Sequence, residues 1–232
     1  MNLLSRRSAG SLLVSVFSMA AAQGCSKLFT EAPKKLYRVT PKSTFPPGLP
    51  HVTAQLIIDI PSAPAGLDTE RIALADSPLQ LDYFADAQWT DRAPVVVQTA
   101  LLESFENSGV VAAVDREPTD LRADFVLKTE LRHFEAAYDS RKEPPRVWVG
   151  LNVRLVDAAD REIIGQRSVT QQVPAEANDV PHVVLAFDEA LGAAMKEIVV
   201  WAVTSPALRR PPAASSAATS LSDPVPPLPR RR

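Results

Sequence analysis

The sequence predicts an α+β domain of two layers, in which a mostly antiparallel sheet packs against two main helices. Several segments alternate apolar and polar residues with the period of two that is typical of strands. Two segments, at about 91–107 and from about 179 onward, instead repeat apolar residues every three or four positions, as helices do. Hydrophobic residues make up 46% of the 232 residues, which is enough to fill the core of one ordinary domain.

The first 24 residues have the pattern of an export signal. Two arginines precede an apolar stretch at 9–22, which is shorter than the roughly 20 residues that a membrane-spanning helix needs. The only cysteine, Cys25, follows Ala22 and Gly24, which are small as in a bacterial lipoprotein signal, whereas Gln23 and the lack of Leu at the third position upstream depart from that signal. We therefore predict a lipoprotein signal peptide over 1–24 and lipidation of Cys25. Cleavage by ordinary signal peptidase, which would leave a free thiol, stays open as the alternative.

Two observations bear on the fate of Cys25. A lone exposed thiol on an exported protein invites oxidation and cross-linking, which favours lipidation. The next residue is Ser26 rather than Asp, so nothing signals retention at the inner membrane. We therefore expect a lipoprotein of the outer membrane that faces the periplasm.

The 21 prolines are concentrated towards the two ends of the chain and mark its domain borders. Residues 25–50 are predicted to form an extended, Pro-rich tether, and residues 205–232 a disordered tail rich in Pro, Ala and Arg. The domain itself is expected over 51–204. The net charge of −2 conceals an acidic body of −8 over 25–205 and a basic tail of +4. A chain so close to neutral is not expected to bind nucleic acid.

The first half of the domain is predicted to hold short strands around one helix. The helix at about 91–107 has Pro94 in its first turn and Gly109 as its stop signal. Its buried stripe is expected to be Val97, Leu101 and Phe105. Strands are expected at 54–60, which Pro61 ends, at 71–75 and 79–84, which form a hairpin, at 110–114, and as an edge strand at 35–39.

The second half is predicted to hold three longer strands and a long helix. In the first strand the inward residues change parity between Leu131 and Phe134, which predicts a bulge near His133. The second strand alternates without a fault from Val147 to Leu155, and a third is expected from Glu162 to about Val173. The last helix is expected to bury Val184, Phe187, Leu191, Ala194, Ile198 and Trp201 on the sheet.

The sequence contains no pattern that predicts catalysis or a cofactor. It lacks the nucleophile elbow G-x-S-x-G, a Gly-rich phosphate loop and the H-E-x-x-H zinc motif. A single cysteine excludes internal disulfides and Cys-rich zinc sites. The three histidines are scattered, and the closest acidic neighbour on a shared strand face, Glu135 beside His133, is more often a surface pair than a metal site. We therefore expect no catalytic residues, no metal and no cofactor.

A candidate surface for a partner protein lies between residues 65 and 89. Gly66 permits a turn, and the spacing of Asp68 and Arg71 suits a cap or an ion pair that locks the loop. The same two side chains could instead contact a partner. Tyr83 and Trp89 combine apolar bodies with polar tips and would extend that surface, although they fit a core equally well.

At these residues the sequence resembles the ABC-type transport auxiliary lipoprotein family, which includes the PqiC (YmbA) lipoproteins. The resemblance covers about 36–203. Its pieces are Tyr37-Arg38-Val39, Gly66-Leu67-Asp68-Thr69-Glu70-Arg71-Ile72-Ala73, Leu81-Asp82-Tyr83-Phe84-Ala85-Asp86-Ala87-Gln88-Trp89, Ala93-Pro94, Phe105-Glu106-Asn107-Ser108-Gly109, Ala123-Asp124, Glu130-Leu131, Phe134 and Ala186-Phe187.

The resemblance implies a non-enzymatic role beside a transporter. Its expected partners are an MCE-domain protein and an ABC permease and ATPase, which together move phospholipids or other hydrophobic molecules between the two membranes. A membrane contact through the lipid anchor and a homo-oligomer are further expectations. The alternatives are a scaffold lipoprotein that only supports envelope integrity and a periplasmic enzyme. A docking module should expose an apolar or aromatic patch near residues 68–89, whereas an enzyme should gather polar groups in one pocket.

Overall fold

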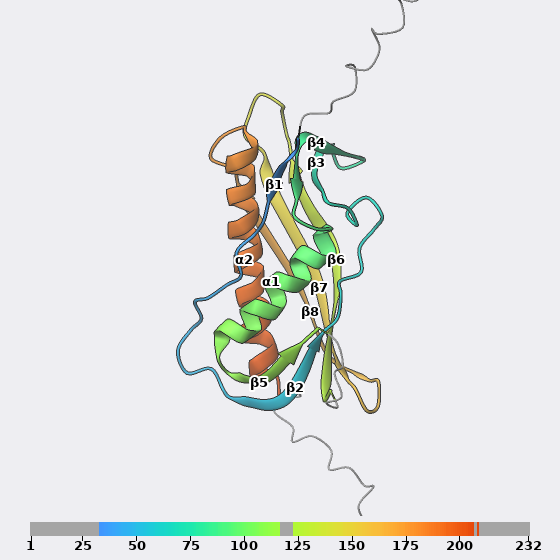
Figure 1. Cartoon of the computed structure of the whole chain (residues 1–232), viewed down its shortest axis with the longest axis vertical. Helices are drawn as coiled ribbons and strands as arrows, with labels where there is room; N and C mark the ends of the chain where they lie inside the picture. The colour runs from blue at the N-terminus through green and yellow to red at the C-terminus, as the bar shows by residue number, and fades with distance from the viewer. Residues whose placement is uncertain (1–32, 117–122, 207, 209–232) are drawn as a thin grey trace, which may run out of the picture. The chain divides into compact units, whose positions relative to one another are not determined.

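Strand β6 (Phe125–Ala137) lies at the centre of the sheet, and its two edges are paired differently (Figure 1). The computed structural model describes residues 33–116, 123–206 and 208. One edge of β6 pairs antiparallel with β7 (Arg146–Asp157), which pairs antiparallel with β8 (Ile163–Pro174). The other edge is shared, because β2 (Val52–Ile58) pairs with its first part and β3 (Arg71–Ser77) with its last part.

Three further pairings extend the sheet. Strand β5 (Val111–Asp115) extends it beyond β2, while β4 (Gln80–Trp89) and β1 (Lys35–Tyr37) extend it beyond β3. The expected hairpin is therefore confirmed as β3 and β4, and the expected edge strand as β1.

The two-layer α+β class is confirmed, but the prediction of a mostly antiparallel sheet was inaccurate. The pairings β1–β4, β2–β5, β2–β6 and β3–β6 are parallel, so the sheet is mixed. Among the described residues, the antiparallel pairings are β3–β4, β6–β7 and β7–β8. Alternation of apolar residues shows which face of a strand is buried, but it carries no information about the direction of the neighbouring strand.

Two helices cover one face of the sheet (Figure 1). Helix α1 (Ala93–Ser108) starts with Pro94 in its first turn and ends at Gly109, whose φ of 66° is the left-handed conformation of a helix stop. Its predicted stripe of Val97, Leu101 and Phe105 is fully buried. Helix α2 (Val180–Thr204) buries its predicted stripe as well, except that Trp201 is only half-buried. In the described part of the chain, no helix is both long enough and apolar enough to span a bilayer.

The predicted bulge is present in β6. The register between β6 and β7 shifts between Leu131 and His133. Leu131 on one side and Phe134 on the other are therefore both buried against the helices, at 0% and 1% exposure. The shift also turns His133 and Glu135 to the face of the sheet that the helices leave open, where they pair with Gly150 and Trp148 of β7.

The folded part of the chain begins before residue 51, the predicted start of the domain. Beyond β1, the backbone N–H of Thr40 donates to Asp188 Oδ1 of α2 at 2.5 Å, and that of Lys42 donates to Ser104 Oγ of α1 at 2.9 Å. Prolines do keep this segment out of helices and strands, but hydrogen bonds tie it to both helices. At the other end Leu208 is 1% exposed, so the core extends a few residues past α2. The predicted signal peptide, Cys25 and most of the tail lie outside the described residues.

Candidate functional site

The four residues predicted to bind a partner do not form one surface, because Trp89 belongs to the core. Trp89 is 1% exposed, and its ring centroid lies 5.3 Å from that of Phe134 and 5.2 Å from that of Phe187. The end of β4 therefore brings this tryptophan between the sheet and α2. Its buried position removes Trp89 from any partner surface of this conformation.

Asp68, Arg71 and Tyr83 hold the loop before β3 in place. Asp68 Oδ1 accepts from Nη1 of Arg92 at 2.7 Å, so the ion pair that forms joins Asp68 to Arg92 and not to Arg71. The Arg71 guanidinium instead lies 3.6 Å from the ring centroid of Tyr83, a cation–π contact. The Tyr83 hydroxyl donates to the carbonyl oxygen of Gly66 at 3.1 Å. These side chains fasten the loop to the hairpin.

The hairpin of β3 and β4 presents the exposed apolar residues of this region. Leu79, in its turn, is 98% exposed, and Leu81 is 40% exposed. Leu81 also packs closely on Gly66, because a Cβ at Gly66 would lie 2.8 Å from Leu81 Cδ2. Exposed apolar side chains that lie together, rather than singly, form a candidate contact surface. We call Pro78, Leu79 and Leu81 the hairpin patch.

A cleft of about 600 Å³ adjoins the hairpin patch on the face of the sheet opposite the helices. It lies between the hairpin and the neighbouring ends of β6 and β7. Its floor carries His133 stacked on Trp148, with ring centroids 3.7 Å apart and planes within 3° of parallel. The indole N–H of Trp148 is buried and has no acceptor among the described residues. The cleft thus combines an aromatic floor with an apolar wall.

Glu135 and Gly150 position the imidazole of His133. The Nδ1 atom of His133 lies 2.8 Å from Glu135 Oε1, while Glu135 Oε2 accepts the backbone N–H of Phe134 at 2.6 Å. Glu135 is only 8% exposed, so its carboxylate is a fixed partner for the ring. Gly150 leaves room for the imidazole, since a Cβ there would lie 2.8 Å from His133 Cδ2. The pair that the sequence placed on a strand face therefore lines the cleft, with the His133 ring in its floor.

Tyr138 and Arg141 stiffen the rim of the cleft. Arg141 forms an ion pair with Asp76 of β3, and this hydrogen bond raises the pKa of the guanidinium. Its Cζ atom lies 4.9 Å from the ring centroid of Tyr138. Burial raises the pKa of the Tyr138 hydroxyl, which donates to Asn178 Oδ1 at 3.0 Å. The hairpin is therefore tied to the loop that follows β6.

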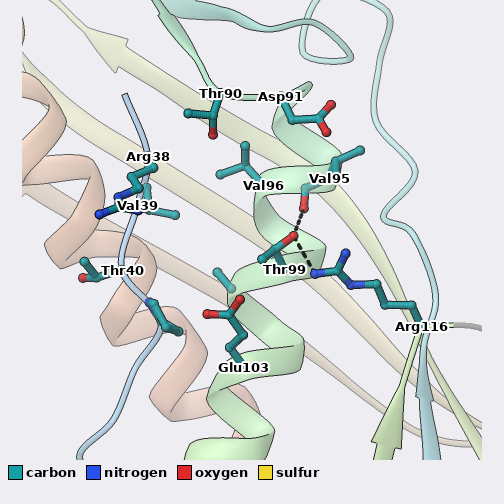
Figure 2. A pocket seen from close by; sticks show the side chains of 12 residues that line it. Arg38, Val39, Thr40, Thr90, Asp91, Val95, Val96, Thr99, Glu103 and Arg116 are labelled. Atoms are coloured by element: carbon teal, nitrogen blue, oxygen red, sulfur yellow. Dashed lines mark hydrogen bonds between the residues drawn. The ribbon is translucent and has the colours of Figure 1, made fainter. Parts of the chain in front are cut away.

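A second cleft, of about 550 Å³, lies between α1 and the segment that follows β1 (Figure 2). Charges of both signs line it: Arg38, Asp91, Glu103 and Arg116. Arg116 reaches across to α1, where its Nη2 donates to Thr99 Oγ1 at 3.0 Å, and Thr99 in turn donates to the carbonyl oxygen of Val95 at 2.9 Å. No group of three or more metal-ligating side chains that could hold an ion occurs among the described residues.

The sequence alone did not identify the hairpin patch or the aromatic floor, although the patch lies within residues 65–89, where a partner surface was expected. Leu79 and Leu81 fit the pattern of an ordinary half-buried strand, and only the fold shows that Leu79 is almost fully exposed while Leu81 is partly exposed. The placement of Leu79 directly after Pro78 was the available signal, because a turn cannot bury a large side chain easily.

Comparisons with known proteins agree with this architecture. A family model described as ABC-type transport auxiliary lipoprotein component matches residues 35–199. An uncharacterized protein of Bradyrhizobium diazoefficiens, bll6063, is 32% identical over 175 residues, which are 74% of this chain and 46% of that protein. The chain thus spans about half the length of this curated relative.

Two solved structures share the fold. The crystal structure of XCC0632 from Xanthomonas campestris matches with a TM-score of 0.69 at 30% identity, over 73% of this chain and 94% of that chain. The crystal structure of an uncharacterized protein matches with a TM-score of 0.57 at 15% identity, over 72% of this chain and 97% of that chain. The second likeness, at so low an identity, concerns the fold alone.

Proposed function

Because the chain belongs to the family of ABC-type transport auxiliary lipoprotein components, we propose that it docks an ABC transporter that works with an MCE-domain protein. In this proposal it is a non-catalytic subunit, and the complex moves phospholipid or other hydrophobic molecules between the inner and outer membranes. The chain is anchored at the outer membrane through a lipid on Cys25 and faces the periplasm.

The hairpin patch is the observation that supports docking. Leu79 is 98% exposed on a hairpin that the Asp76–Arg141 ion pair and the Gly66–Leu81 contact hold in place. The hairpin patch offers a partner exposed apolar side chains to pack on. The neighbouring cleft, with its aromatic floor, offers a recess for a side chain of the partner. Anchoring adds to such a contact, because a tethered domain meets its partner at a high local concentration.

Docking is tested by replacing Leu79 with Asp in the full chain. We expect the permease, ATPase and MCE protein to co-purify with the wild type after crosslinking in the cell envelope, and to be lost with Leu79→Asp. The matched control is Leu185→Asp, since Leu185 is 64% exposed on α2 and lies far in sequence from the patch. A wild-type chain that captures no such component would falsify the transport proposal. Equal capture by Leu79→Asp would instead remove the hairpin patch from it.

Anchoring is tested separately with Cys25→Ala. Loss of the thiol prevents lipidation, so the variant is expected to appear in the soluble periplasmic fraction, while the wild type sediments with outer membranes on a density gradient. A variant that still sediments with outer membranes would show that Cys25 is not the anchor. A wild type found with inner membranes would overturn the proposed location.

A further inference from the structure

Strand β8 is a long edge of the sheet. It runs over 12 residues, and β7 is its only strand neighbour in the part of the chain that the structure describes. Helix α2 packs along the face of β8, and no described strand pairs with its outer edge. The outward N–H and C=O groups of such an edge can pair with another strand.

This edge lacks most of the protection that natural proteins give to edge strands. Short length, charged side chains, internal prolines and central bulges are the usual devices. In β8 the only proline, Pro174, stands at its end, and the only register shift lies near its start, beside Leu155 and Val156. The only charged side chain, Arg167, is held by α2, because its Nη2 donates to Glu197 Oε1 at 2.8 Å.

The residue order of β8 is complementary to itself. When two copies of the strand run antiparallel about an axis at Val169, Gln166 faces Gln172 and Ser168 faces Thr170 on the open face of the sheet. On the helix face Arg167 meets Gln171, so no two like charges lie opposite each other. Gln171 already donates to Glu197 Oε2 at 3.3 Å, which places one carboxylate within reach of both side chains.

The ends of β8 add apolar contacts to this pairing. In the same register Gly165 faces Val173 of the second copy, and Val173 is half-buried. The ring of the half-buried Trp201 lies over Gly165, where a Cβ would be 3.3 Å from its Cζ2 atom. Ile163 is 58% exposed at the same end. An antiparallel partner strand would cover all three apolar side chains.

We propose that β8 pairs antiparallel with β8 of a second copy of this chain, about a two-fold axis at Val169, so that the two sheets become continuous. The proposal does not depend on the transport function, because β8 is remote in sequence from the hairpin patch and uses a different edge of the fold. The cleft beside the hairpin patch reaches β8 only at Gln172, whereas the proposed axis lies at Val169.

The register is tested with two differently tagged full chains that are expressed together in the cell envelope. One carries Ser168→Cys and the other Thr170→Cys. Directly opposed Cβ atoms in an antiparallel pair lie about 4.5–5.5 Å apart, close enough for a disulfide after small adjustment. We expect mild oxidation to produce a disulfide-linked dimer that carries both tags. Ser168→Cys paired with Ser140→Cys, and the two wild-type tags with only Cys25, are the controls.

The second variant combines Ser168→Lys with Thr170→Lys and sets cations directly opposite each other across the axis. We expect it to lose the dimer seen by light scattering of the detergent-extracted full chain, while Ser140→Lys keeps it and both retain the wild-type circular dichroism. The pairing would be overturned if no mixed-tag disulfide exceeded the controls or if linkage occurred only to a different protein. A dimer that persists in the double-lysine variant would overturn it as well. A dimer that persists in Leu79→Asp would confirm that this edge and the docking patch are separate.

Discussion

Gly150 shows how one small residue sets the geometry of the cleft. Any side chain at this position of β7 would meet the imidazole of His133, whose Cβ atom lies 3.1 Å from the place of the added carbon. The absence of a Cβ lets the ring stack on Trp148 while Glu135 holds its Nδ1 atom. The floor therefore depends on the absence of a side chain at Gly150.

We expect Gly150→Ala to destabilise the fold by about 1–3 kcal/mol, because the added methyl group overpacks the ring in a rigid sheet. The matched background is His133→Ala, which removes the clashing ring. In that background the same Gly150→Ala change should cost less than about 1 kcal/mol. Urea unfolding of the four chains measures both costs. Equal costs in the two backgrounds would show that the imidazole is not the obstacle.

Single residues were the scale at which sequence reasoning about the site was least successful. Trp89 and Leu79 illustrate the reason, since hydrophobic side chains look alike in a sequence whether they are buried or exposed. Trp89 is covered because β4 is followed by α1 and passes beneath α2, whereas Leu79 is exposed because it lies in a turn. Exposure depends on what the rest of the chain places above a residue.

At the scale of elements, Asp179 determines where α2 begins. Its backbone is extended, and its Oδ1 atom accepts the N–H of His182 at 3.0 Å, as a helix cap does. This backbone hydrogen bond, followed by the contact with the His182 ring, lowers the pKa of Asp179 below its ordinary value of 3.8. The charged form of the cap is therefore the one that the fold stabilises.

Because folding lowers the pKa of Asp179, the direction in which its contribution to stability changes with pH can be predicted. A carboxylate with a lower pKa in the folded state stabilises the fold above its ordinary value of 3.8, and this contribution is lost as the pH falls through the folded-state pKa. We expect Asp179→Ala to lower the Tm near neutral pH, and the gap to wild type to narrow below about pH 4. Thermal unfolding across this range measures the gap, with Asp179→Asn as a control that keeps an acceptor. A gap that widens in acid would contradict the assignment.

Elements were the scale at which the sequence was most informative. The change of parity between Leu131 and Phe134 located the bulge, because a strand can keep both residues buried only by inserting one more. Pro94 and Gly109 likewise marked the ends of α1 closely. The direction of neighbouring strands could not be predicted, since the β2–β6 and β3–β6 pairings join segments far apart in the chain.

At the scale of the whole domain, the segment after β1 ties the two helices together. Thr40 donates to Asp188 through its backbone N–H and again through its hydroxyl, whose oxygen lies 2.8 Å from each carboxylate oxygen. Beyond it, the Lys42 N–H donates to Ser104, and Asn107 Nδ2 donates to the Lys42 carbonyl at 3.2 Å. The alternation of apolar and polar residues cannot predict these hydrogen bonds, because the segment is neither helix nor strand.

We expect Asp188→Ala to release the segment after β1 from α2. Hydrogen bonds to a charged acceptor contribute more than neutral ones, but this carboxylate is partly exposed, so the loss should be about 1 kcal/mol in urea unfolding. Trypsin should then cleave the folded chain faster at Arg38 and Lys42. Glu189→Ala removes an exposed neighbouring carboxylate and serves as the control. Unchanged cleavage at both sites would mean that Asp188 does not hold the segment.

In the proposed function, an anchored, rigid domain docks a transporter through the hairpin patch. A photo-activatable amino acid at Leu79, introduced into the full chain in living cells, reports directly what this patch contacts. We expect a crosslink from position 79 to the permease, the ATPase or the MCE protein, and none of these crosslinks from position 185, which is also exposed. Crosslinks from position 79 only to unrelated envelope proteins, or equal labelling from both positions, would contradict the proposed docking.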